Sequence, residues 1–399
     1  MKINLLLLST VSLLLTACSI KNIQKENDTN TTNTQETNLT TTTHLRHNTE
    51  EAPIISSSDA PTPNTMLAPT IETNQEVEGG LTGEFANNPL LSYFIERMHT
   101  EHGFDYDYLY KLFSDAHNSD YVDIPCDTNS DSSKNCNVTL KPKGKWDRYK
   151  GMFIYERNIN RGVAFWNEHE QTLNRAYKEY GVLPEYIIGI LGIETAYGVN
   201  FGKKRVIDVL TTKAMLGDRR EAFYTDQLEK FLLMARQSNL DAATLMGSSA
   251  GAMGYGQFIP SSYLTFAVDF NGDGVTDLWN AEDAIGSVAN YFSQNGWNRN
   301  ISQVAVRAKY KGNRFKRLKT GYKTKYSQYK LRKKYGIKAR KKLHYKGPVS
   351  LIKLPKHGYD ELWFGTHNFR VITTYNHSTF YGMAVVVLGN KVKNRRYGK

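Results

Sequence analysis

Long hydrophobic runs are scarce in this chain. Beyond its first 18 residues, none of the 399-residue sequence approaches the roughly 20 consecutive apolar residues that a membrane span requires, so we expect no internal transmembrane helix. Hydrophobic residues still make up 40% and aromatic residues 12% of the chain, which is enough for a sizeable core. The length allows two or three domains.

Cysteine is also rare, with three in the chain. The first lies at the end of "MKINLLLLSTVSLLLTAC", a basic start followed by a short apolar run, which predicts a signal peptide over residues 1–17. The last four letters resemble a bacterial lipobox, which implies cleavage before Cys18 and lipid attachment to its thiol. An ordinary secretory signal with a chance cysteine is the alternative. Ser19 in place of aspartate resembles lipoproteins of the outer membrane, so we expect an outer-membrane anchor with the chain facing the periplasm.

The other two cysteines, Cys126 and Cys136, flank the polar loop "DTNSDSSKN". An exported chain meets an oxidising compartment, where an even pair favours a disulfide that closes this loop. Two free thiols are the alternative, and the spacing excludes a CxxC metal site.

Apolar residues nearly disappear between residues 18 and 87, where Asn, Thr, Ser, Glu and Pro dominate. Such a segment cannot bury enough apolar surface to offset its ordering entropy, so we expect a disordered, lipid-anchored tether. Residues 88–390 are globular and mostly helical in pattern, with short strand-like runs near the end. The expected fold class is therefore mainly α with a small β part (α+β). Residues 162–182 have the spacing of a single amphipathic helix.

Acidic residues are absent between Asp283 and Asp360, while residues 308–346 interleave Lys and Arg with six tyrosines. In a cytosolic protein this pattern would suggest nucleic-acid binding. In an exported chain we expect no nucleic acid, and contact with anionic cell-wall peptides or membrane head groups is more reasonable. A solvated, partly disordered insertion is the alternative.

A single carboxylate interrupts the aliphatic stretch "GILGIETAYG" at residues 189–198. Ile187, Ile190 and Leu191 share a helical face with Glu194, and Pro184 suits the first turn of that helix. Burial there would raise the pKa of the carboxyl group, as a general acid near neutral pH requires. The alternative is a glutamate at the rim of the face, with its carboxylate in water.

The stretch "GSSAGAMGYGQFIPSSY" at residues 247–263 is rich in glycine and places Gln257 between Tyr255 and Phe258. It lacks the Gly-Lys-Ser/Thr of a phosphate-binding loop. An amide among aromatic rings suits a sugar, whose hydroxyls need hydrogen bonds and whose faces stack on rings. A glycine-rich structural turn is the alternative.

An EF-hand-like pattern occupies residues 269–283, "DFNGDGVTDLWNAED". Asp269, Asn271 and Asp273 occupy positions 1, 3 and 5, and the carbonyl of Val275 position 7. Asn280 replaces the usual glutamate at position 12, so Asp283 would close a lengthened loop. This predicts a structural Ca²⁺ site, with a metal-free acidic turn as the alternative.

Together with "ITTYNHSTFYGMAV", these three stretches resemble the membrane-bound lytic murein transglycosylases of the B type, over about residues 90 to 390. The resemblance implies a lysozyme-like catalytic core with added helical and C-terminal portions. It also implies that Glu194 is the sole catalytic carboxylate and that Asp283 ligates calcium. The implied substrate-binding residues are Arg219, Arg220, Ser248, Tyr255, Gln257, Phe258, Tyr291, Tyr375, Asn376 and Tyr381.

The expected activity is cleavage of the β-1,4 bond between N-acetylmuramic acid and N-acetylglucosamine in peptidoglycan without water, leaving 1,6-anhydromuramic acid ends. Expected partners are the glycan strands, a membrane through the N-terminal lipid, and possible wall-remodelling proteins. A hydrolytic muramidase and a non-catalytic peptidoglycan-binding scaffold are the alternatives.

Overall fold

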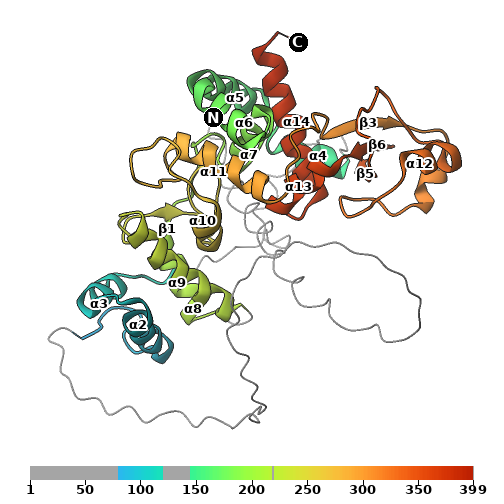
Figure 1. Cartoon of the computed structure of the whole chain (residues 1–399). Helices are drawn as coiled ribbons and strands as arrows, with labels where there is room; N and C mark the ends of the chain where they lie inside the picture. Colours follow the sequence, from blue (N-terminus) through green and yellow to red (C-terminus); the bar gives the residue numbers. More distant parts are fainter. Residues whose placement is uncertain (1–79, 120–143, 218–219, 399) are drawn as a thin grey trace, which may run out of the picture. The chain divides into compact units, whose positions relative to one another are not determined.

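The computed structural model describes residues 80–119, 144–217 and 220–398 (Figure 1). No helix in these ranges is long and apolar enough to cross a membrane. Several sequence predictions lie outside the described residues: the signal peptide, the tether as far as residue 79, Cys18, Cys126, Cys136 and Arg219.

The centre of the fold is helix α7 (Pro184–Glu194), which begins with proline and ends at the glutamate singled out above. Every residue from Glu185 to Ile193 is buried, so protein surrounds α7 on all sides. The prediction of a single apolar face on this helix is therefore too narrow. Helix α14 (Thr379–Arg396) packs along it. The two backbones approach closely because Gly189 faces the carbonyl of Val385, where a Cβ would lie 2.5 Å from the oxygen.

Three further helices pack against this pair: α5 (Glu156–Glu168), α6 (Glu170–Tyr180) and α11 (Ala281–Gln294). The single helix predicted over 162–182 is wrong, because the chain breaks at His169, whose φ of −108° and ψ of 28° are not helical. No glycine or proline causes the break. Instead, α5 packs on α14 whereas α6 packs on α11, so the two halves of the predicted helix contact different helices.

A second group of helices contains α8 (Val206–Met215), α9 (Glu221–Gln237) and α10 (Pro260–Phe266), with α2 (Pro89–His102) and α3 (Tyr106–Ser114) nearby. A short ribbon of β1 (Lys204–Arg205) and β2 (Met246–Gly247) adjoins α8. The folded region begins earlier than predicted, because Phe85 is buried in the core and Glu84 pairs with His117.

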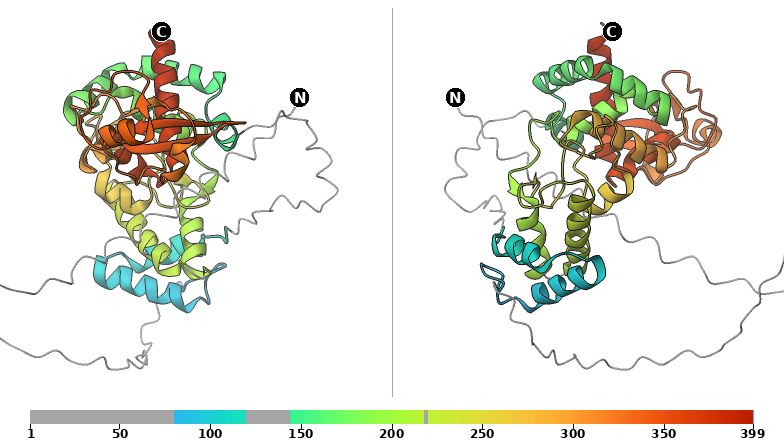
Figure 2. Two further views of the ribbon diagram at one scale, coloured as in Figure 1. Left: turned by 90° about the vertical axis from the view of Figure 1, so that its right-hand side faces the viewer. Right: turned by 60° about the vertical axis from the view of Figure 1, so that its left-hand side comes forward.

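The C-terminal part contains an antiparallel sheet in the order β4-β3-β6-β5, whose strands lie side by side (Figure 2). Its strands are β3 (Ala305–Lys309), β4 (Lys338–Ala339), β5 (Ser350–Pro355) and β6 (Asp360–Gly365). The 3₁₀ helix η3 (Arg314–Arg317) and α12 (Gln328–Tyr335) lie between β3 and β4. Helix α4 (Lys145–Gly151) contacts β5, and α13 (His367–Tyr375) follows β6. The expected α+β class is confirmed.

The lysine-rich segment is folded, so the alternative of a partly disordered insertion is wrong. Phe315, Leu331 and Ile337 are buried together with apolar residues of β5 and β6. This second small core is assembled from residues that are far apart in sequence and separated by cations, which is why sequence periodicity does not reveal it.

Candidate active site

Glu194 is the last residue of α7 and its side chain remains partly exposed, although protein surrounds it closely. The hydroxyl of Tyr381 on α14 donates a hydrogen bond of 2.5 Å to its Oε1 atom. Burial raises the pKa of Glu194 to about 7, and the Tyr381 hydrogen bond opposes this shift. A carboxyl group that is half-protonated near neutral pH, on a residue that is not fully enclosed, can donate a proton to a bound substrate.

Two tyrosines stack beside this carboxyl group. The rings of Tyr375 and Tyr381 lie 6.4 Å apart with an interplanar angle of 8°. The hydroxyl of Tyr375 donates to the carbonyl of Gly256 at 2.5 Å. Burial raises the pKa of both phenols well above the ordinary value, and the Glu194 charge raises it further. Both tyrosines therefore stay neutral, and Tyr381 acts as a hydrogen-bond donor to Glu194.

Tyr149 on α4 is a site residue that the sequence analysis missed. Burial, and then the charge of Glu194, raise the pKa of its phenol. Its buried hydroxyl has no hydrogen-bond partner among the described residues. It lies 45 residues before Glu194, in "DRYKGMF", which matches no recognisable motif. Only the packing of α4 against α14 brings it to the site.

Aromatic rings extend from this centre as one continuous cluster. Phe258 lies 5.9 Å from Tyr375 and 6.0 Å from Tyr291, and Tyr291 lies 4.8 Å from Tyr375. Phe258, Tyr291, Tyr375 and Tyr381 come from three different parts of the chain. The structure therefore brings together four of the predicted substrate-binding residues.

The glycine-rich stretch is both a structural turn and part of the site. Gln257 has a left-handed backbone, with φ of 52°, and its amide nitrogen donates to the carbonyls of Gly254 and Phe201. Its amide oxygen has no hydrogen-bond partner in the described residues, so it can accept from a ligand. The hydroxyl of Thr195 lies 3.1 Å from the carbonyl of Tyr255, which ties this stretch to the end of α7.

A strained turn follows the catalytic candidate. Ala196 and Tyr197 both have positive φ, at 50° and 62°, which is uncommon for residues other than glycine. The ring of Tyr197 fits against Gly162 of α5 and Gly192 of α7, where a Cβ atom at either glycine would clash with its hydroxyl. That hydroxyl is buried without a partner among the described residues. The ring therefore fixes the turn by packing alone.

For three of the predicted substrate-binding residues, the hydrogen bonds among the described residues lie within the protein and do not involve Glu194. The hydroxyl of Ser248 accepts from the backbone amides of Ala252 and Ala250, so it braces the glycine-rich stretch. Asn376 is buried and lies directly after α13. Arg220, directly before α9, donates to the hydroxyl of Tyr224 on that helix, and its role toward sugar peptides stays a prediction.

The EF-hand-like loop is preformed, but its carboxylates bond to the backbone. Asp269 accepts from the amides of Gly272 and Gly274, and Asp273 from that of Val275. Asp283 is fully buried and accepts from three backbone amides. No group of three or more His, Cys, Asp or Glu side chains is close enough to hold a metal in the described parts of the chain.

The buried Asp283 nevertheless favours a cation at this loop. It has no ion pair among the residues that the structure describes. Burial raises its pKa, the backbone hydrogen bonds oppose this, and the nearby Asp269 charge raises it again. A buried carboxylate that lacks a countercharge and lies near a second one is costly, even with backbone hydrogen bonds, unless it takes up a proton or a cation neutralises it. The oxygen-only donors suit a hard ion such as Ca²⁺.

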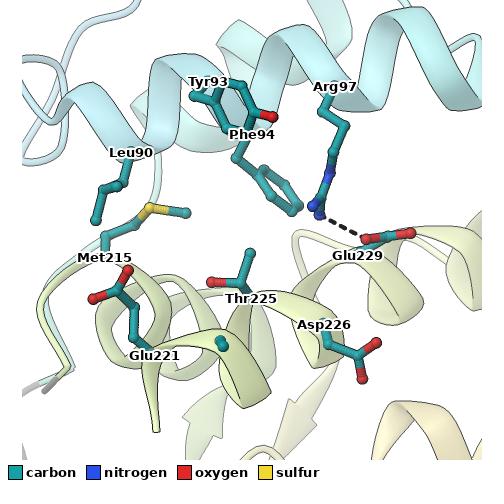
Figure 3. A pocket seen from close by; sticks show the side chains of 10 residues that line it. Leu90, Tyr93, Phe94, Arg97, Met215, Glu221, Thr225, Asp226 and Glu229 are labelled. Atoms are coloured by element: carbon teal, nitrogen blue, oxygen red, sulfur yellow. Dashed lines mark hydrogen bonds and ion pairs between the residues drawn. The ribbon is translucent and has the colours of Figure 1, made fainter. Parts of the chain in front are cut away.

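A separate pocket of about 360 Å³ lies between α2 and α9 (Figure 3). Leu90, Tyr93 and Phe94 form its apolar wall. Arg97 and Glu229, which form an ion pair, line another part of it. It contains none of the predicted site residues, and its acidic groups are largely paired within the protein.

Comparison with known proteins agrees with this geometry. Residues 86–390 match the family described as the transglycosylase SLT domain. The membrane-bound lytic murein transglycosylase B of Escherichia coli (strain K12) is 45% identical over 310 residues, covering 78% of this chain and 84% of that protein. Two solved structures of the E. coli lytic transglycosylase Slt35, one with bulgecin A and one with calcium, each have a TM-score of 0.71 and 43% identity. Each match covers 82% of this chain and 100% of the chain in the solved structure.

The predicted family and the lysozyme-like expectation are thereby confirmed. The chain belongs to the transglycosylase SLT domain family and is a peptidoglycan lytic transglycosylase.

Proposed function

We propose that Glu194 serves first as general acid and then as general base in one non-hydrolytic cleavage of the glycan strand. The observation that carries this proposal is the Glu194 carboxyl group, whose pKa burial raises to about 7 at a residue that is not fully enclosed. Near that pH both protonation states are populated, so one group can give a proton in one step and take one in the next.

The first step breaks the glycosidic bond to the N-acetylmuramic acid. The Glu194 carboxyl group transfers its proton to the glycosidic oxygen, and the bond between that oxygen and C1 breaks. The carbonyl oxygen of the sugar's own N-acetyl group forms a bond to C1 and leaves a cyclic oxazolinium. The free amide oxygen of Gln257 and the neutral phenols of Tyr149 and Tyr381 are candidates to orient this sugar by hydrogen bonds.

The second step closes a ring. The Glu194 carboxylate takes the proton of the C6 hydroxyl, whose oxygen bonds to C1 as the bond to the N-acetyl oxygen breaks. The products are the leaving strand with a new hydroxyl and a 1,6-anhydromuramic acid end. Glu194 returns to its protonated form, and no water is consumed.

The two-carboxylate mechanisms of hydrolysis need a second carboxylate, roughly 5 Å away as a nucleophile or somewhat farther as a base for water. No other carboxylate contacts Glu194 in the described part of the chain, where its one hydrogen-bond partner is Tyr381. This favours the internal hydroxyl over water. The scaffold alternative leaves the raised pKa of Glu194 without a purpose.

Glu194→Gln tests the assignment. The amide keeps the shape and the Tyr381 contact but cannot transfer a proton, so we expect cleavage of isolated sacculi to fall by about 10²–10⁴-fold or more. Binding to sacculi should remain. Cleavage within a few-fold of the native rate would remove Glu194 from the catalytic role.

We also infer that the loop of Asp269, Asn271, Asp273, Val275 and Asp283 holds a structural Ca²⁺. The lengthened EF-hand pattern, the uncompensated Asp283 and the calcium complex of Slt35 support this. The ion would stabilise α11, whose first turn contains Asp283 and which carries Tyr291 of the site.

The location of the chain is a proposal as well. The lipobox at Cys18 and the description of the E. coli relative as membrane-bound support a lipid-anchored protein of the outer membrane that faces the periplasm. Radiolabelled palmitate should enter the native chain and not the Cys18→Ala variant.

A further inference from the structure

The positive charge of the protein is concentrated in one segment. Residues 308–346 contain 17 of its 51 Lys and Arg and none of its 39 Asp and Glu. The whole chain has a net charge of +12, so all other residues together carry a net charge of −5. The positive character of the protein therefore belongs to this segment, whose 17 cations we call the lysine-rich face.

The face is held in place by a folded support. Phe315 and Leu331 anchor η3 and α12 to the sheet through a small core, which Ile337 joins directly before β4. These elements are drawn in orange in Figure 1. Helix α12 is capped by Ser327 and ends at Gly336, which has a left-handed φ of 68°. Nine of the 17 cations therefore project from β3, η3, α12 or β4, where folded structure fixes the backbone that carries them.

None of these cations has a carboxylate partner among the residues that the structure describes. All 17 side chains are exposed, and the structure records no ion pair for any of them among residues 80–119, 144–217 and 220–398. By contrast, Arg307 and Lys356 just outside the segment pair with Glu361 and Asp147. Like charges at this density destabilise a compact fold through mutual repulsion. A surface that only has to stay soluble does not require so many unpaired cations in one segment.

The composition of the face favours a broad anionic surface over a small anionic ligand. Thirteen of the 17 cations are lysines, which act as mobile, hydrated point charges, whereas discrete carboxylate or phosphate recognition favours the arginine fork. None of the 17 lines the described pocket. Tyr329 on α12 is 66% exposed beside Arg332, and amphipathic rings of this kind are favoured at the level of lipid head groups.

We propose that the lysine-rich face binds an anionic lipid surface. The lipid expected at Cys18 would hold the chain at a membrane, and a polybasic face adds a second, reversible contact of the kind that strengthens lipid anchoring. This proposal concerns binding alone and does not depend on the chemistry at Glu194.

The test uses the full chain with Cys18→Ala, so that no attached lipid contributes, and with Glu194→Gln, so that sacculi remain intact. The test variant adds Lys330→Gln, Arg332→Gln, Lys333→Gln and Lys334→Gln, all exposed on α12. The matched control adds Lys111→Gln, Arg157→Gln, Lys178→Gln and Lys391→Gln, which are exposed elsewhere and remove the same charge. Binding is measured by sedimentation with vesicles of phosphatidylcholine alone or with one-third phosphatidylglycerol.

We expect the parent chain to bind the anionic vesicles at low salt and to release them at about 0.5 M salt, where the screening length falls to a few ångströms. Each cation near such a surface is worth about fivefold in partitioning, so two of the four facing the lipid give a loss of about 25-fold in the α12 variant. The control should bind within about threefold of the parent, because its cations lie outside the face.

Three outcomes overturn the proposal: equal binding to neutral and anionic vesicles, equal losses in both variants, or salt-sensitive sedimentation with sacculi but not with vesicles. The last would identify the wall polymer as the partner. Thermal melts of both variants confirm that they are folded. Cleavage of soluble glycan strands by the α12 variant in a Glu194 background separates this result from the proposed function, because the rate should not change.

Discussion

Replacing Glu194 with glutamine should make the protein inactive and also more stable at neutral and alkaline pH. The folded-state pKa of Glu194 is raised from 4.5 to about 7, chiefly by burial. Below pH 4.5 the carboxyl group is neutral in both the folded and the unfolded protein. Between these values the folded protein keeps a proton that the unfolded protein releases, so the free energy of unfolding falls as the pH rises.

The magnitude follows from the shift. A difference of about 2.5 pKa units corresponds to roughly 3 kcal/mol at about 1.4 kcal/mol per unit, and this is an upper limit. Because the Glu194 side chain is partly exposed, solvent screening reduces the expected effect to about 1–2 kcal/mol. Glutamine has no charge to desolvate and keeps an oxygen for Tyr381, so it escapes this penalty.

The assay is denaturant unfolding of the native and Glu194→Gln proteins at several pH values from 4 to 8. The stability advantage of the variant should be small at pH 4 and reach its full value above pH 7. Glu101→Gln is the control, because Glu101 is exposed on α2 and has no ion pair among the described residues. An advantage that is absent, or that does not grow with pH, would refute the claim that burial penalises the Glu194 charge.

Three further changes probe the surroundings of the site. Tyr381→Phe removes a hydrogen bond that lowers the pKa of Glu194, so the alkaline limb of the kcat/KM profile should move up by as much as ~1 pH unit; an unmoved limb would show that the bond does not tune the acid. Tyr197→Phe removes a buried hydroxyl without a partner, so the free energy of unfolding should rise by about 1 kcal/mol, and a loss instead would reveal a hidden partner. Calcium should raise the Tm of the native chain and not of Asp273→Ala, since a bound ligand stabilises the folded state, and equal responses would argue against the proposed loop.

The catalytic candidate could be predicted from sequence because its environment is local. Proline at the start of α7, the aliphatic residues around Glu194 and the EF-hand-like spacing all lie within short windows. Family resemblance then supplied the aromatic residues that surround Glu194. Periodicity failed for the break at His169, because the different partners of α5 and α6 are far away in sequence.

Long-range packing also explains what the sequence did not reveal. Tyr149 reaches the site through contacts of α4 with distant elements, and the strained pair Ala196 and Tyr197 depends on glycines of two helices. Disorder of the lysine-rich segment stayed open as an alternative because its few apolar residues pack against strands that follow it in the chain. In each case the deciding contact joins residues that no local window contains.

The most direct measurement of the central claim is mass spectrometry of peptidoglycan digested in ¹⁸O-labelled water. Ring closure by the muramic acid C6 hydroxyl consumes no water, so the fragments should be lighter by one water than those of a hydrolase and should carry no label at the cleaved ends. Reducing muramic acid ends that carry ¹⁸O from the moment of cleavage would contradict the account and make the enzyme a hydrolase.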